Sequence, residues 1–104
     1  ELTDRFYTEV LGLEQLPRPG FPFKGLWLRA GGQEIHLIEV AEHNTPEGQH
    51  FAFAVDDIDG VCETLAARGV KVSKPMSIPG AGRQAFFRDP SGNLVELNQP
   101  RRPT

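Results

Sequence analysis

Cysteine is nearly absent from this sequence, because Cys62 is the only one in 104 residues. A single cysteine forms no intramolecular disulfide, which excludes a disulfide-stapled secreted domain and favours a reducing, intracellular compartment. No neighbouring group would lower the pKa of the thiol, so we interpret Cys62 as a packing residue. Long hydrophobic runs are also missing, because no segment approaches the ~20 apolar residues that cross a bilayer, and no signal-peptide pattern is present. We therefore expect a cytoplasmic protein with no membrane partner.

An excess of positive charge is missing too. The formal net charge is −3, and acidic and basic residues are mixed along the chain. This balance excludes a basic face for nucleic acid and a polybasic patch for membranes, so a small molecule is the expected partner. A chain of 104 residues has surface enough to cover one hydrophobic core. We expect a single domain over residues 1–104.

The first part of the chain contains one helical pattern and two strand-like runs. One apolar stripe at helical spacing predicts a helix over residues 2–11 with a buried face, closed by Gly12 in a left-handed conformation. The stripe consists of Leu2, Phe6, Tyr7, Val10 and Leu11. The runs KGLWLRA (24–30) and QEIHLIEV (33–40) flank Gly31-Gly32, a residue pair typical of a two-residue hairpin turn. The sequence therefore predicts a helix followed by a β-hairpin.

The second part repeats this alternation. HFAFAV (50–55) alternates with period two, which predicts a half-buried strand. DDIDGVCETLAARG predicts a helix with Asp56 or Asp57 as N-cap and Gly69 as terminator. The remaining segments are predicted as a short strand VKV (70–72), a long mobile loop SKPMSIPGAG (73–82), and strands RQAFF (83–87) and NLVEL (93–97) joined by a type I turn.

The two parts resemble each other, which indicates an internal duplication. The alignment matches Trp27 with Phe86, Arg29 with Arg88, and His36 with Glu96. We therefore expect an α+β fold of two βαβββ modules, module one over residues 1–42 and module two over 49–99. The second module opens with a strand that begins at His50. The equivalent strand of the first module would precede Glu1, so we expect that module to lack its opening strand.

Strand alternation places three possible metal ligands on one side of these modules. In HFAFAV the bulky residues pack under a helix, which turns His50 to the opposite face. In NLVEL, Val95 and Leu97 pack in the same way, so Glu96 turns to the face that His50 occupies. In EIHLI the flanking apolar residues pack, and His36 turns inward.

Two imidazoles and one carboxylate are a common ligand set for a divalent first-row metal, and strands hold such ligands rigidly. We therefore predict His36, His50 and Glu96 as ligands of a divalent ion, with Fe, Mn, Ni, Zn and Co indistinguishable from the sequence. Each residue also has a structural alternative. Glu96 could pair with Arg29 or Arg88, and His36 could simply be hydrogen-bonded to its neighbours.

Segments across nearly the whole chain, including RFYTEVLGLE, QEIHLIE, HFAFAVDDID and FFRDPSGNLVEL, resemble the vicinal oxygen chelate superfamily. This family includes glyoxalase I, extradiol dioxygenases, fosfomycin-resistance thiol transferases and bleomycin-binding proteins. The resemblance implies a curved mixed sheet that cups a metal, with ligands on the first and fourth strands of each module. It places His50 and Glu96 on both ligand positions of module two and His36 on the fourth-strand position of module one. Glyoxalase I usually has an acidic residue at the position of His36, so the resemblance is to glyoxalase-like proteins rather than to glyoxalase I.

The resemblance implies lyase or isomerase chemistry on a small substrate chelated through vicinal oxygens. Glu96 is the predicted catalytic residue, with Glu34 as another possible base. Trp27 and Phe86 are predicted to line the substrate pocket, or else to be core residues. Arg29, Arg88 or Arg83 could bind an anionic group of the substrate, or else lie in solvent at the strand ends.

Other functions remain open at this point. Two histidines and a carboxylate also form the facial triad of Fe(II) oxygenases, which allows an extradiol-type dioxygenase. A non-catalytic small-molecule binding protein, like the bleomycin-resistance relatives, is the third possibility. A homodimer is expected, because the family often dimerises and the missing strand would expose a sheet edge.

Overall fold

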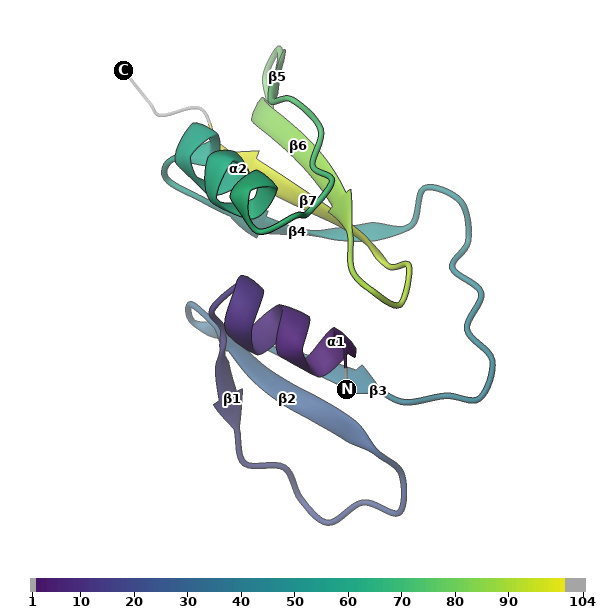
Figure 1. Ribbon diagram of the computed structural model, residues 1–104. Coiled ribbons are helices and arrows are strands. Elements are labelled where there is room, and N and C mark those ends of the chain that lie inside the picture. Colours follow the sequence, from purple (N-terminus) through teal and green to yellow (C-terminus); the bar gives the residue numbers. More distant parts are fainter. Residues whose placement is uncertain (1, 101–104) are drawn as a thin grey trace. The chain divides into compact units, whose positions relative to one another are not determined.

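The computed structural model describes residues 2–100 and divides the chain into two compact units, Glu1–Asn44 and Thr45–Thr104 (Figure 1). Each unit contains a helical segment and an antiparallel or mixed sheet, which confirms the predicted α+β class. The units are described one at a time below.

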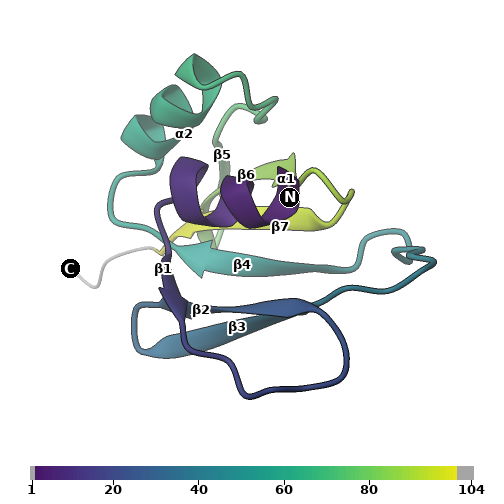
Figure 2. The same ribbon diagram turned by 60° about the horizontal axis from the view of Figure 1, so that its bottom comes forward.

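The first unit is a helical segment followed by three antiparallel strands in the order β1-β2-β3, with β2 and β3 side by side in Figure 2. Its core contains Phe6, Tyr7, Leu26 and Leu28. Its elements are α1 (Leu2–Arg5), the π-helical turn η1 (Phe6–Val10), β1 (Glu14–Leu16), β2 (Gly25–Ala30) and β3 (Gln33–Ile38).

The first helix differs in detail from the prediction. Its second half is π-helical, because the N–H of Leu11 donates to the carbonyl of Phe6, five residues back, at 2.9 Å. The wider turn rotates the following residues away from a single 3.6-residue stripe. Only Phe6 and Tyr7 of the predicted stripe are buried, whereas Leu2 is 74% exposed. The predicted burial of Leu2 is therefore wrong.

The hairpin formed by β2 and β3 has the predicted register. Trp27 lies opposite His36, and Arg29 lies opposite Glu34. Gly31 has a φ of 61°, a left-handed conformation that glycine adopts without strain and that matches the first turn residue of a type II′ hairpin. The Gly-Gly pair thus sets which side chains of the two strands face each other.

The second unit is a complete βαβββ module. Its sheet has the order β4-β7-β6-β5, in which β4 is parallel to β7 and the other pairs are antiparallel. Its elements are β4 (His50–Ala54), α2 (Ile58–Ala67), β5 (Met76–Ile78), β6 (Gly82–Arg88) and β7 (Leu94–Gln99). The described part of the first unit has the same order from its helix onward, as the predicted duplication requires.

Helix α2 covers one face of this sheet (Figure 1). Asp57, not Asp56, is the N-cap, and its carboxylate accepts a hydrogen bond from the N–H of Gly60. Gly69 follows the helix with a φ of 84°, as predicted for a terminating glycine. The helix buries Ile58, Cys62 and Leu65, and the sheet buries Ala85, Phe87, Val95 and Leu97.

Three short segments were not predicted correctly. β1 was missed because it is three residues long with two polar side chains, and its pairing with β2 is what defines it as a strand. VKV (70–72) is not a strand. The second strand of the module is instead β5, inside the segment predicted as a mobile loop. Pro75 interrupts the chain between Ser73, which bonds to the backbone of Phe86, and the start of β5 at Met76.

The duplicated registers agree at the predicted site positions. Trp27 and His36 are cross-strand partners in the first unit, and Phe86 and Glu96 are cross-strand partners in the second. The alignment that matched these four residues from the sequence is therefore confirmed by the pairing in each unit.

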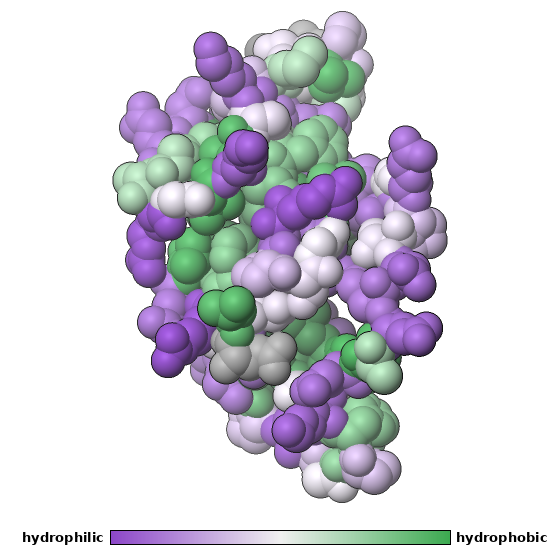
Figure 3. All heavy atoms as spheres, turned by 45° about the vertical axis from the view of Figure 1, so that its right-hand side comes forward, coloured by the Kyte–Doolittle hydropathy of each residue, from purple (hydrophilic) through white to green (hydrophobic). Residues whose placement is uncertain are grey.

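The surface carries several exposed apolar side chains. On the face drawn in Figure 3, hydrophobic residues are interspersed with hydrophilic ones. Over all faces, the large hydrophobic side chains that are exposed to solvent are those of Leu2, Phe21, Phe23, Ile38, Val40, Met76 and Ile78. Of the helices formed by the described residues, none has the length and hydrophobicity that crossing a membrane requires.

Candidate functional site

His50 and Glu96 meet on one face of the second unit, as strand alternation predicts. The Nε2 atom of His50 lies 2.9 Å from Oε1 of Glu96, and its Nδ1 atom lies 2.7 Å from the carbonyl oxygen of Gly48. β4 and β7 are neighbours in the sheet, with Ala52 opposite Glu96, so the small alanine leaves room for the imidazole to reach the carboxylate. The ring of Phe86 stands edge-on to His50, with 5.4 Å between ring centroids.

This geometry requires a positive charge at the imidazole. Both ring nitrogens face an oxygen acceptor, yet a neutral imidazole has only one N–H to donate. Either a second proton or a cation must therefore lie between Nε2 and the Glu96 carboxylate. A backbone carbonyl at Nδ1 is also the common outer partner that turns a histidine's Nε2 toward a metal. The pair thus fits a divalent ion by its donor chemistry.

Glu96 is held in place by a residue that the sequence analysis missed. Its side chain is about 10% exposed, and its Oε2 atom accepts a hydrogen bond of 3.3 Å from the amide of Asn98. The same amide donates to the carbonyl of Ala81 at 3.2 Å. Asn98 stands two residues after Glu96 on the same strand, so period-two alternation alone places both on one face. That spacing was the available signal.

The environment of His50 raises the pKa of its imidazole above the ordinary value of 6.5, first through the Gly48 carbonyl and then through Glu96. Because the pKa of His50 is higher in the folded than in the unfolded protein, protonation of His50 stabilises the fold below about pH 6.5, and this contribution is lost as the pH rises through the folded pKa.

In metal-free protein we expect the C2 proton of His50 to titrate with a midpoint above 6.5 by NMR. Glu96→Gln should lower that midpoint, while part of the increase remains because the Gly48 contact persists. A wild-type midpoint at or below 6.5 would contradict the geometry.

In the first unit, His36 is stacked on Trp27. Their ring centroids are 3.9 Å apart with an interplanar angle of 4°, and Nε2 of His36 lies 3.0 Å from Oε1 of Glu34. The structural alternative for His36, a hydrogen bond to its neighbours, therefore holds in this unit. The contact also makes Trp27, the only tryptophan, a direct reporter of events at the His36 ring.

Two of the arginines predicted to bind substrate, Arg29 and Arg88, already have partners within their own units. Arg29 pairs with Glu14 at 3.2 Å, and Nη1 of Arg88 donates to the carbonyl of Gly92 at 2.9 Å. The Glu96 carboxylate instead contacts His50 and Asn98, so the alternative in which Glu96 pairs with Arg88 is wrong for the second unit.

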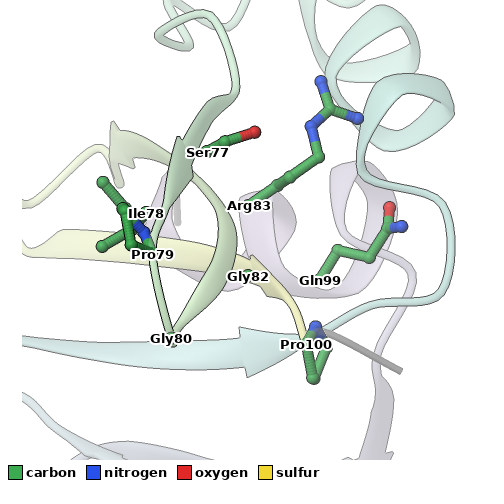
Figure 4. Close-up of a pocket in the computed structure, with 8 residues that line it drawn as sticks. All are labelled: Ser77, Ile78, Pro79, Gly80, Gly82, Arg83, Gln99 and Pro100. Carbon is green, nitrogen blue, oxygen red and sulfur yellow. The ribbon is translucent and has the colours of Figure 1, made fainter. Parts of the chain in front are cut away.

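A pocket of about 380 Å³ lies beside the turn between β5 and β6, and Figure 4 labels its lining residues. Of the residues predicted for the site, Arg83 lines this pocket, and the predicted metal ligands do not. Its two long polar side chains are engaged elsewhere: Arg83 forms two bonds with Asp59, and Gln99 accepts from the N–H of Ile58. The Arg83 guanidinium lowers the pKa of Asp59. This pocket is therefore separate from the His50–Glu96 pair.

Two further findings concern possible reactive groups. Cys62 is buried, and burial raises the pKa of its thiol, which agrees with its interpretation as a packing residue. Within residues 2–100, no group of three or more His, Cys, Asp or Glu side chains is arranged to hold a metal ion.

The model of the Glyoxalase/Bleomycin resistance protein/Dioxygenase superfamily matches residues 3–97. The chain belongs to this superfamily. The resemblance noted in the sequence is thus confirmed over nearly its whole length. Membership accounts for the two modules with matching registers, because paired βαβββ units are the expected architecture of the superfamily.

Proteins similar to this superfamily member carry several functions in their names. A probable lactoylglutathione lyase of Vibrio cholerae is 32% identical over 90% of this chain and 78% of its own length. Among solved structures, an antibiotic binding protein of Streptomyces sp. CB03234 is 35% identical, with a TM-score of 0.78, over 96% of this chain and 85% of that one. The glyoxalase family protein of Enterococcus faecalis is 29% identical, with a TM-score of 0.78, over 94% and 86%. The chain spans 31% and 59% of the length of two relatives from Arabidopsis thaliana.

Proposed function

We propose that this chain is a metal-dependent glyoxalase-like protein with lyase or isomerase chemistry on a small substrate that offers two neighbouring oxygens. The observation that carries the proposal is the imidazole of His50 between two oxygen acceptors, which calls for either a second proton or a cation at Nε2 and therefore offers a place for a metal ion. We further propose that both units act as one domain, with His36 of the first unit joining His50 and Glu96 as ligands.

Each proposed site residue has a defined task. His50, oriented by the Gly48 carbonyl, and Glu96, oriented by Asn98, present donors that need little rearrangement. When bound, a divalent ion supplies Lewis-acid polarisation of the two substrate oxygens. The Glu96 carboxylate would take a proton from the carbon that bears the hydroxyl and return it to the neighbouring carbonyl carbon, while the hydroxyl proton passes to the carbonyl oxygen, so that no atom is gained or lost.

The substrate contacts are proposed from the first and second units alike. Phe86, edge-on to His50, and Trp27, stacked on His36, would line the pocket with apolar surface. To bind an anionic group of the substrate, Arg29 would have to release Glu14, and Arg88 would have to release the carbonyl of Gly92. Dimer formation stays a prediction.

The lone tryptophan provides the test. Titration of the metal-free protein with Co²⁺ should load about one equivalent and quench the emission of Trp27, because the His36 ring lies 3.9 Å from the indole. His50→Ala should weaken the quenching titration by more than ~10-fold, since His50 supplies a ligand to the same ion. The loaded protein is then assayed for lactoylglutathione turnover. Equal titrations of wild type and His50→Ala, or loading below about a tenth of an equivalent, would refute the shared site.

A second candidate is small-molecule binding without chemistry. The 35% identity to an antibiotic binding protein favours it. Metal loading with no turnover of any small hydroxycarbonyl substrate, together with tight ligand binding, would decide for this alternative.

A further inference from the structure

Four flat rings follow one another in the first unit. Phe21 and Phe23 are stacked, with centroids 5.2 Å apart and an interplanar angle of 8°, and Phe21 lies 6.1 Å from Trp27. Trp27 in turn stacks on His36. Phe21 and Phe23 are 42% and 43% exposed, so these rings do not serve the core. We call Phe21, Phe23, Trp27 and His36 the ring row. Exposed aromatic residues gathered in one place are typical of a binding surface.

The guanidinium group of Arg18 lies beside the ring row. The guanidinium carbon of Arg18 is 5.1 Å from the ring centroids of both Phe21 and Phe23. Its Nη2 atom donates to the carbonyl of Phe23 at 2.7 Å. Among the described residues 2–100, no carboxylate pairs with Arg18, and its buried Nε atom has no hydrogen-bond partner. An arginine that has no anionic partner and lies next to aromatic surface is suited to a carboxylate or a similar planar anion.

The chain holds this guanidinium in a fixed place. A Cβ atom on Gly25 would lie 3.1 Å from both Nε and Nη2 of Arg18 and would overlap the carbonyl oxygen of Leu37. Glycine at position 25 therefore leaves the space that the guanidinium occupies above β2. Because the cation is fixed before any ligand arrives, binding loses little side-chain entropy at this point.

We propose that Arg18 and the ring row form a binding site for a planar aromatic anion, a ring system that stacks on Phe21, Phe23 or Trp27 while its carboxylate meets the guanidinium. Trp27 and His36 are shared with the proposed catalytic site, so the inference rests on the proposed function and adds a substrate class to it. The site requires no metal ion, and for this reason its test is carried out in metal-free buffer. A failure here leaves the metal site unaffected, and the reverse also holds.

The test uses three probes and the indole N–H resonance of Trp27, the only tryptophan. 2-Naphthoate should shift this resonance and bind at least ~10-fold more tightly than 2-naphthamide, which keeps the rings but not the charge, or cyclohexanecarboxylate, which keeps the charge but not the aromatic ring. Equal affinity for naphthoate and naphthamide would show that Arg18 contributes nothing. No shift with any probe would show that the ring row is packing alone.

Variants assign the affinity to individual groups. The Arg18→Gln variant should lose the ~10-fold preference for naphthoate over naphthamide. The double variant Phe21→Leu, Phe23→Leu should have a lower affinity for both probes. Arg5→Gln is the matched control, because Arg5 is an exposed arginine of the same unit that pairs with Glu9. A folded Arg18→Gln protein that still prefers naphthoate would overturn the proposal. If that variant does not fold, the three-probe comparison on the wild type decides.

Discussion

Glu96→Gln is expected to weaken Co²⁺ binding by at least ~100-fold, beyond the 10- to 100-fold loss that removal of an outer-shell partner causes. The glutamine keeps the size of the side chain and can still accept a hydrogen bond from Asn98, but it removes the negative charge that a divalent ion needs beside two neutral imidazoles. Turnover should fall with the metal, and more Co²⁺ should not restore it, because the proposed proton acceptor is also lost. Calorimetric titration with Co²⁺ and a turnover assay measure the two effects.

Glu63→Gln is the matched control for this experiment. Glu63 is an exposed residue of α2, so its substitution changes the net charge by the same amount in the same unit. It should leave both affinity and turnover unchanged. If Glu63→Gln and Glu96→Gln weaken Co²⁺ binding equally, the effect is one of net charge, and Glu96 is not a ligand. An unchanged affinity in Glu96→Gln would rule out the metal site as proposed.

Phe87→Ala is expected to lower the free energy of unfolding by about 3–5 kcal/mol. Phe87 is 2% exposed and lies opposite Val95 in the sheet, on the face that buries Ala85 and Leu97. Removing the ring leaves a cavity in the only core that the second unit has among its described residues, and a small unit cannot readily collapse around it. Guanidinium unfolding followed by far-UV circular dichroism measures the change.

Two further variants show whether packing is the cause. Phe87→Leu, which retains most of the volume, should cost less than about 1.5 kcal/mol. Met76→Ala removes a large apolar side chain that is 65% exposed and should change the stability by about 0.5 kcal/mol or less. If Met76→Ala lowered the free energy of unfolding as much as Phe87→Ala, burial would not determine how much stability each substitution costs.

Local patterns were reliable where the residue type has one good conformation. Gly31 and Gly69 marked a hairpin turn and a helix end because their backbone angles are strained for other residues, and both have positive φ. The same reasoning failed for β1 and β5, whose three residues each carry too little periodicity to be recognised. These strands exist because β2 and β6 offer them hydrogen bonds, which is information from elsewhere in the chain.

The candidate site likewise has one part that local patterns predicted and one part that they did not. Alternation in β4 and β7 put His50 and Glu96 on one face, and the structure bears this out within the second unit. The carbonyl of Gly48 could not be foreseen, because it reaches Nδ1 from a loop whose path no periodic pattern specifies. The membership of His36 in the same site stays a prediction, which the Trp27 quenching experiment tests.

Motifs in the sequence alone identified the family by resemblance. Periodicity and glycine alone indicated the hairpin turn at Gly31, the end of α2 and the shared face of His50 and Glu96, because these features depend on neighbouring residues of the chain. Only the tertiary structure decided which atoms meet. It placed oxygen at both nitrogens of His50 and, within residues 2–100, brought no carboxylate to Arg18, since such contacts depend on where loops and neighbouring strands bring distant residues. Short-range patterns carry no information about these contacts.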